Sequence, residues 1–180
     1  QGLATFPGDH PLHAGFGFSP SAVPAARNAF AECDCLLAVG TRFAEIPTGS
    51  FAAAVPAGLI HIDIDPRVLG ANYPAEIAVE SDAKAALSAL AAELARRGAA
   101  RLAGETAARI ARDKAAYKAE WLAHDSKGRV NPQRFFDALR KAAPADCVTV
   151  LDDGNHTFLA AELFTIRRGG ALLTPPDVNA

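Results

Sequence analysis

The stretch from Cys35 to Pro66, CLLAVGTRFAEIPTGSFAAAVPAGLIHIDIDP, decides the fold. It contains two short runs that are mostly apolar, Cys35–Val39 and Gly58–Ile64, and each run ends in a turn signal. Strands that are apolar throughout and alternate with helices indicate a parallel sheet covered on both faces. We therefore expect an α/β fold, a Rossmann-like parallel sheet in which Cys35–Val39 and Leu59–Ile64 are neighbouring strands.

Helical patterns flank these runs. Residues 22–32 can form a short helix, and a longer helix is predicted over 83–97. Asp82 suits its N-cap, and Gly98 follows its last turn, where a terminating glycine belongs. One face of the longer helix carries three leucines: Leu87, Leu90 and Leu94. We expect this face to pack on the sheet, so that Leu90→Ala would cost about 2–5 kcal/mol.

The ends of the chain differ from this central pattern. Residues 1–20, rich in Gly, Pro and His, read as an irregular loop. An Ala-rich helix over 105–124 is the best candidate for a linker. The last residues, LLTPPDVNA, bring no closing element.

A second strand–helix pattern begins near Asn131, where Asn-Pro is typical of a helix start. Its apolar face is expected to turn Phe135, Phe136 and Leu139 toward a core. A strand over Cys147–Leu151, a turn and a helix over 158–164 follow.

These patterns divide the chain into three parts. We expect a partial central Rossmann-like domain over 1–98, a helical linker over 99–128, and the truncated start of a second α/β domain over 129–180. The chain begins with Gln1 and contains no Met. We therefore expect an internal fragment of a longer protein.

Composition excludes several classes of function. Half of the residues are hydrophobic and the net charge is −2, without a basic stripe, which argues against nucleic acid as a partner. No apolar run reaches the roughly 20 residues of a membrane span. The three cysteines follow no disulfide spacing, which fits reduced thiols in the cytoplasm.

Polar clusters follow the predicted strands, where ligands of parallel sheets bind. Arg42, after Gly40 and Thr41, could pair with a phosphate, but an exposed arginine on a tight turn explains the pattern better. Asp63 and Asp65 alternate with isoleucines. They could accept hydrogen bonds from ribose hydroxyls or form a solvated strand end, and acid–base or metal chemistry ranks third.

A third cluster covers Asp152 to His156, DDGNH. Gly154 permits a sharp turn, and the N–H groups that follow it would lie at a helix N-terminus, which suits an anion. An ordinary turn with an aspartate N-cap is the alternative.

At these residues the sequence resembles a known family. FPGDHPLHAG, AECDCLLAVGTRF, IHIDIDP and ESDAKAALSAL resemble, in order, the second half of the central domain of thiamine diphosphate-dependent enzymes such as acetolactate synthase. VNPQRFFDALRKAAPADCVTVLDDGNH resembles the start of their C-terminal, diphosphate-binding domain. Each motif alone is weak evidence for the family, but the five motifs in this order are strong evidence for it.

The resemblance implies a cofactor-binding segment in this chain, and it implies that other parts of the active site are missing. Gly154, Asn155 and His156 match the segment that touches the cofactor's diphosphate, although many relatives have Gln where Asn155 stands. The family's activating glutamate lies in an N-terminal domain that the resemblance does not reach. The metal-binding G-D-G motif does not occur in this sequence. We therefore expect the chain to be inactive by itself, with no catalytic and no metal-binding residue of its own.

Some relatives bind FAD in the central domain, but the match here is poor. The second arginine expected after Gly40-Thr41-Arg42 is missing, because AEIP follows at 44–47. FAD is therefore not expected. A nucleotide pocket formed by Arg42, Asp63 and Asp65 is kept as an alternative.

The resemblance implies that the parent protein uses thiamine diphosphate and Mg²⁺ to decarboxylate or ligate a 2-oxo acid. The alternative is a non-catalytic, Rossmann-like nucleotide-binding or oligomerisation module. Because a truncated sheet leaves unpaired edges and bare apolar surface, we also expect a homo-oligomer.

Overall fold

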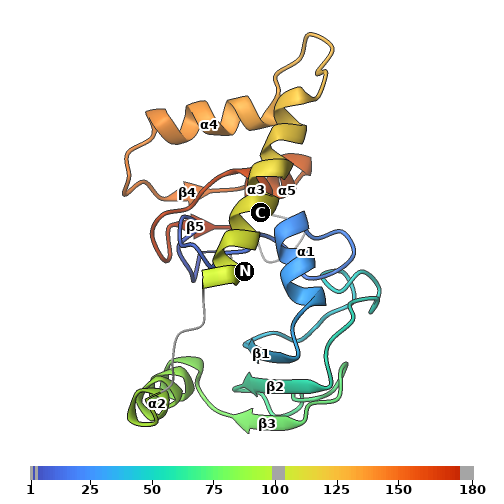
Figure 1. The fold of residues 1–180 in the computed structure, drawn as a ribbon, viewed down its shortest axis with the longest axis vertical. Coiled ribbons are helices and arrows are strands. Elements are labelled where there is room, and N and C mark those ends of the chain that lie inside the picture. The colour runs from blue at the N-terminus through green and yellow to red at the C-terminus, as the bar shows by residue number, and fades with distance from the viewer. Residues whose placement is uncertain (1, 3, 99–103, 175–180) are drawn as a thin grey trace. The chain divides into compact units, whose positions relative to one another are not determined.

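The computed structural model describes residue 2 and residues 4–98 and 104–174, and it divides the chain into two compact units (Figure 1). Unit 1 comprises residues 1–16, 23–26 and 103–180. Unit 2 comprises residues 17–22 and 27–102. The first unit therefore joins segments from both ends of the sequence.

Unit 2 is built on a parallel sheet of three strands in the order β1-β2-β3. The strands are β1 (Cys35–Val39), β2 (Gly58–Asp63) and β3 (Ile77–Glu80). In β1 and β2, Leu37 stands opposite Ile60. The predicted parallel pair, and with it the α/β class, is confirmed. The third strand was not predicted, because its four residues are mostly exposed and carry no long apolar run.

The core of unit 2 lies at the centre of this sheet. Leu59 on β2 is 0% exposed and packs with Ala38 and Phe43, which are also buried. Partly buried side chains surround this group: Phe18, Leu36, Val55, Tyr73 and Ala75. The core is small, and β2 supplies its most buried side chain.

Helix α1 (Pro24–Ala31) precedes the three strands in the sequence, and helix α2 (Ala83–Arg96) follows them. The predicted caps of α2 are confirmed. The Asp82 side chain accepts a hydrogen bond from the Ala85 N–H at 2.9 Å. Gly98 has a φ of 64° and donates its N–H to the Ala95 carbonyl, as a terminating glycine does.

Helix α2 contacts β2, as predicted, but the expected burial of its leucine face is wrong. No residue of the helix is buried, and Leu87, Leu90 and Leu94 are 42%, 37% and 46% exposed. The spacing of the leucines is helical, but the described residues do not cover that face. The expected cost of 2–5 kcal/mol for Leu90→Ala, which assumed burial, therefore does not hold for this chain.

Unit 1 combines three helices with a short parallel strand pair. The elements are α3 (Gly104–Ala123), α4 (Pro132–Ala142), β4 (Thr149–Val150), α5 (Asn155–Leu163) and β5 (Leu172–Leu173). Helix α4 contacts both α3 and α5. The buried core is Ala4, Phe136, Ala160, Leu163, Phe164, Ile166 and Ala171, with Tyr117 and Trp121 of α3 packed against it.

Several details of unit 1 correct the sequence-based expectations. Phe136 is buried, but Phe135 and Leu139 are 49% and 38% exposed, because only one row of the α4 face meets the core. The strand expected over Cys147–Leu151 is reduced to two residues that pair in parallel with β5. That closing strand was missed because its two leucines are followed by Thr-Pro-Pro, which reads as a loop.

The irregular N-terminal segment is held by main-chain hydrogen bonds. The Gly8 N–H donates to the Ile166 carbonyl at 2.7 Å, and the Gly170 N–H donates to the Ala4 carbonyl at 2.9 Å. The loop is thereby fixed to the segment that connects α5 with β5. The boundaries of the three parts, 1–98, 99–128 and 129–180, stay a prediction.

Within the described ranges, no helix is both long and apolar enough to cross a membrane. The same residues contain no group of three or more His, Cys, Asp or Glu side chains placed to hold a metal ion.

Candidate functional site

The segment Gly154-Asn155-His156 forms the start of α5, after the loop that follows the carboxyl end of β4. Gly154 is the N-cap of α5 and has a φ of 143°, a conformation that glycine adopts without a steric penalty. A Cβ at this position would come within 2.9 Å of the Cε1 and Nδ1 atoms of His156. The positive φ therefore favours glycine here, in agreement with the sharp turn that Gly154 was expected to permit.

The N-terminus of α5 is open. Asn155 and His156 are exposed, and no side chain in the described part of the chain caps the helix at Gly154. The Asp152 carboxylate does not cap the helix, because it accepts a hydrogen bond from the neighbouring Asp153 N–H at 2.7 Å. Uncapped N–H groups and the positive end of the helix dipole form a site that suits an anion.

The second candidate site lies at the carboxyl edge of the unit 2 sheet. Gly40 continues the ladder by donating its N–H to the Ile62 carbonyl at 2.9 Å. This hydrogen bond brings the turn that carries Arg42 beside the end of β2. Arg42 is exposed, and its carbonyl accepts a hydrogen bond from Asn72 Nδ2 at 2.9 Å.

The two aspartates of this edge make local hydrogen bonds. Asp63 Oδ1 accepts from the Asp65 N–H at 3.0 Å. The Asp65 carboxylate binds the Arg67 guanidinium through two contacts, at 2.9 and 2.7 Å. These hydrogen bonds from Arg67 hold the pKa of Asp65 at about 2. Asp65 is therefore ionised in ordinary buffers and already has a cationic partner.

The structure thus brings Arg42, Asp63 and Asp65 to one sheet edge without joining them. Among the described residues, no ion pair links Arg42 to either aspartate. Arg67, which the sequence reasoning did not single out, takes that role for Asp65. The local pairs favour the solvated strand end that the sequence allowed, and the nucleotide pocket stays a prediction.

His61 is the residue of this edge that the sequence reasoning missed. It is 1% exposed; its Nδ1 accepts the Gly70 N–H at 3.2 Å, and its Nε2 lies 2.9 Å from the Thr41 carbonyl oxygen. Because the backbone N–H can only donate, Nδ1 is unprotonated and Nε2 carries the hydrogen. The ring therefore ties the turn after β1 to the loop after β2. A histidine flanked by isoleucines inside an apolar strand was the available signal.

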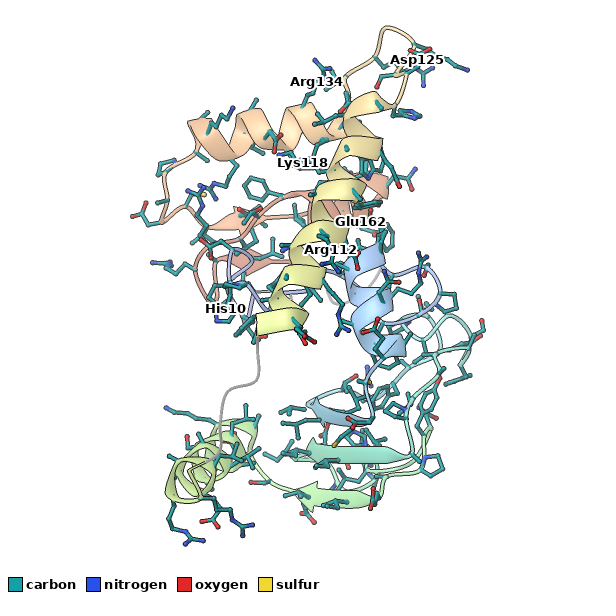
Figure 2. The ribbon with its side chains drawn as sticks, viewed as in Figure 1. His10, Arg112, Lys118, Asp125, Arg134 and Glu162 are labelled. Carbon is teal, nitrogen blue, oxygen red and sulfur yellow. The ribbon has the colours of Figure 1, made fainter. Side chains whose placement is uncertain are left out.

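A small cavity in unit 1 gathers three titratable side chains: His13, Lys114 and Glu162. Its volume is about 60 Å³. Lys114 Nζ on α3 donates to the His13 carbonyl at 2.9 Å. Figure 2 shows Glu162 on α5 near α3, where it accepts a hydrogen bond from the Tyr117 hydroxyl at 2.7 Å. Helix α3 therefore holds both the N-terminal loop and α5.

His13 should make the stability of unit 1 dependent on pH. Burial, and secondly the Lys114 ammonium, lower the pKa of His13 below its usual 6.5, while Asp9 opposes the shift. The folded state thus favours the neutral ring, so the stabilisation is complete above pH 6.5 and is lost as the pH falls through the folded pKa. We expect an NMR titration to place the midpoint of the His13 ring below 6.5, and a midpoint above that value would contradict the burial argument.

Comparison with known proteins places the chain in a family. Residues 1–90 match the model described as thiamine pyrophosphate enzyme, central domain. The chain is 44% identical over 95 residues to a probable acetolactate synthase large subunit of Methanocaldococcus jannaschii, covering 52% of this chain and 16% of that protein.

Two further relatives extend the similarity over nearly the whole chain. It is 32% identical over 163 residues to the acetolactate synthase isozyme 2 large subunit of Escherichia coli, covering 90% of this chain and 28% of the relative. It is 31% identical over 174 residues to the acetolactate synthase large subunit of Cyanidium caldarium, covering 94% and 29%. The chain therefore spans less than a third of the length of these curated relatives. The match over half of its residues shows that the chain belongs to the thiamine pyrophosphate enzymes, and that residues 1–90 correspond to their central domain.

Proposed function

We propose that the protein to which this sequence belongs is a thiamine diphosphate-dependent lyase or transferase that decarboxylates or ligates a 2-oxo acid, in the manner of an acetolactate synthase. The open N-terminus of α5 at Gly154-Asn155-His156 is the observation that carries the proposal. The family membership and the acetolactate synthase relatives support it.

The residues of this turn fit one end of the cofactor. The diphosphate is anionic, and the exposed N–H groups at the start of α5 can donate to its oxygens. The His156 ring is exposed beside the same turn and can donate a further hydrogen bond. When bound with Mg²⁺, thiamine diphosphate supplies the electron sink for cleaving and forming the carbon–carbon bond.

The second proposed site is a nucleotide pocket at Arg42, Asp63 and Asp65. Its support is that three charged side chains lie at the carboxyl edge of a parallel sheet, where such ligands bind. The pairing of Asp65 with Arg67 argues against FAD, because Arg67 already occupies both carboxylate oxygens that could bind a ribose.

The flavin expectation has a direct test. The purified protein should be colourless, without the flavin absorption band near 450 nm, because Arg42 stands without the second arginine of the flavin-binding pattern. A yellow preparation with about one flavin per chain would contradict this prediction. Added ADP, titrated by calorimetry, would separate a nucleotide pocket from a flavin site.

We further propose that the protein is cytoplasmic, acts on a small molecule rather than on nucleic acid or a membrane, and forms a homo-oligomer. The free thiols of Cys33, Cys35 and Cys147 support a reducing compartment. The proposed boundaries are a central domain over 1–98, a helical linker over 99–128 and a diphosphate-binding segment over 129–180. The end of the family match at residue 90, close to the end of α2, supports the first of them.

A chimera tests the proposed function. The matching segment of the Escherichia coli acetolactate synthase isozyme 2 large subunit would be replaced by residues 1–174 of this chain. We expect the chimera to form acetolactate, and we expect Gly154→Val in it to abolish activity and weaken binding of thiamine diphosphate. A chimera that folds and binds the cofactor but forms no product would favour the non-catalytic alternative.

The 180-residue chain alone should show no turnover of pyruvate or benzoylformate with thiamine diphosphate and Mg²⁺. The reason is that its sequence contains no G-D-G motif to hold the metal. Product above a buffer blank, in a sample free of host enzyme, would contradict this expectation.

A further inference from the structure

The N-terminal loop, residues 4–16, is bound to the rest of unit 1 by a side-chain cation as well as by its main chain. The Lys114 ammonium on α3 donates to the His13 carbonyl at 2.9 Å and to the Gly8 carbonyl at 3.3 Å. Gly8 also approaches the segment after α5 so closely that a Cβ there would lie 3.0 Å from the Ile166 carbonyl oxygen. The loop is therefore closely fitted, and Lys114 binds it to α3.

The His13 ring lies where a positive charge is unfavourable. Its Nδ1 atom is buried and makes no hydrogen bond within the described part of the chain. One face of the ring is stacked on Phe6, with the centroids 6.3 Å apart and an interplanar angle of 10°. The ring lines the cavity of about 60 Å³ that Lys114 also lines, and such a space holds only a few water molecules. Little water can therefore screen the ring from the ammonium.

The side chains that face the ring leave it without a free anionic partner. The titratable ones come from the loop, α3 and α5: Asp9, His10, Lys114 and Glu162. Burial is the largest cause that lowers the pKa of His13, followed by the Lys114 ammonium, and Asp9 opposes both. The Glu162 carboxylate already accepts a hydrogen bond from the Tyr117 hydroxyl. The segment after α5 lines the cavity with uncharged side chains.

A protonated His13 ring would compete with Lys114 for one acceptor. The backbone group that favours the protonated ring is the carbonyl of His13 itself. The same carbonyl already accepts the hydrogen bond from Lys114. Two like charges at one acceptor repel each other, so protonation of the ring and attachment of the loop to α3 oppose each other.

We propose that His13 and Lys114 form an acid-sensitive latch, which releases the N-terminal loop from α3 while the helices of unit 1 stay folded. At neutral pH the ring is uncharged and the Lys114 ammonium holds the loop. When the ring takes up a proton, the two cations separate and the loop detaches. Residues 1–90 match the central domain of the family, so the latch joins a segment of that domain to a helix outside the match.

Hydrogen exchange of single amides in the 180-residue chain tests the latch. The Gly8 amide, which donates to Ile166, reports on the loop, and the Phe164 amide, which donates to Ala160, reports on α5. After correction for intrinsic exchange, Gly8 protection should fall severalfold, and at most about tenfold, from about pH 7.5 to about pH 5.5. The limit follows because a released ring with a pKa of about 6.5 is about nine-tenths protonated at the lower pH. Phe164 protection should stay constant.

Three variants assign the effect to the latch. His13→Phe keeps a ring that can stack on Phe6 but takes up no proton, so Gly8 should stay protected at both pH values. His10→Asn is the matched control: it keeps an acceptor for the Leu12 N–H, which His10 Nδ1 binds at 3.1 Å, and it should keep the pH response. Lys114→Met removes the ammonium, so Gly8 protection should already be low at about pH 7.5.

Four results would overturn the proposal. They are Gly8 protection that does not change with pH, a pH response that persists in His13→Phe, native Gly8 protection in Lys114→Met, and Phe164 protection that falls together with that of Gly8. The last result would show that acid unfolds unit 1 as a whole, without a separate release of the loop. None of these measurements uses the proposed enzymatic activity, so the latch and that activity are tested independently.

Discussion

Leu59→Ala is expected to lower the free energy of unfolding of unit 2 by about 2–5 kcal/mol. Leu59 is 0% exposed and lies in the central strand, packed with Ala38 and Phe43. The substitution leaves a cavity between the sheet and the Phe43 ring, where the neighbouring strands on both sides limit relaxation. The core has few other large buried side chains, so little can compensate for the loss.

Hydrogen exchange of the β2 amides would measure this loss of unfolding free energy. The measurement should be made at concentrations where the chain is monomeric. Leu90→Ala is the matched control. Because Leu90 is 37% exposed, it should cost less than about 1 kcal/mol. The single tryptophan, Trp121, belongs to unit 1, so its fluorescence follows the other unit. Equal losses for the two leucine variants would show that α2 is buried in solution.

His61→Phe should destabilise the carboxyl edge of the same sheet by about 1–3 kcal/mol, although it preserves a ring of similar size. The substitution removes both hydrogen bonds of the imidazole and leaves the Gly70 N–H and the Thr41 carbonyl without that partner. We expect the Gly70 amide to exchange markedly faster, together with amides of the turn that carries Arg42.

Tyr73→Phe provides the control for this prediction. Tyr73 packs on the same Phe43 ring, and its hydroxyl is buried without a hydrogen-bond partner among the described residues. Removing that hydroxyl should therefore be neutral or slightly stabilising. If the two variants behave alike, the His61 hydrogen bonds do not hold the edge, and any Arg42 pocket would need another support.

The regular elements could be predicted because their signals are local. The runs of β1 and β2 are apolar and bounded by turn residues, and α2 and α4 carry their capping residues in sequence, Asp82 and Asn131. A cap binds a backbone group three residues away, so adjacent letters are enough to reveal it. Gly154 was found for the same reason, as a glycine between a strand and a helix.

The features that sequence reasoning missed depend on distant partners. Strand β5 has two residues, and only its pairing with β4 defines it. The exposure of the α2 leucines depends on which segments lie opposite them, and the spacing of leucines does not contain that information. For Asp65, the sequence left open a ribose contact or a solvated strand end. In the structure it binds Arg67, a residue that no motif includes.

The division of the sequence between the two units also sets an order for folding. Most of unit 2 is one continuous stretch of sequence, so its strands meet after closing short loops. Unit 1 joins Gly8 to Ile166, and its chain closure must span the whole of the other unit. The entropy of closing a loop rises with its length, and non-local contacts slow folding. Unit 2 should therefore fold first, before the unit that contains the turn at Gly154 closes its longer loop.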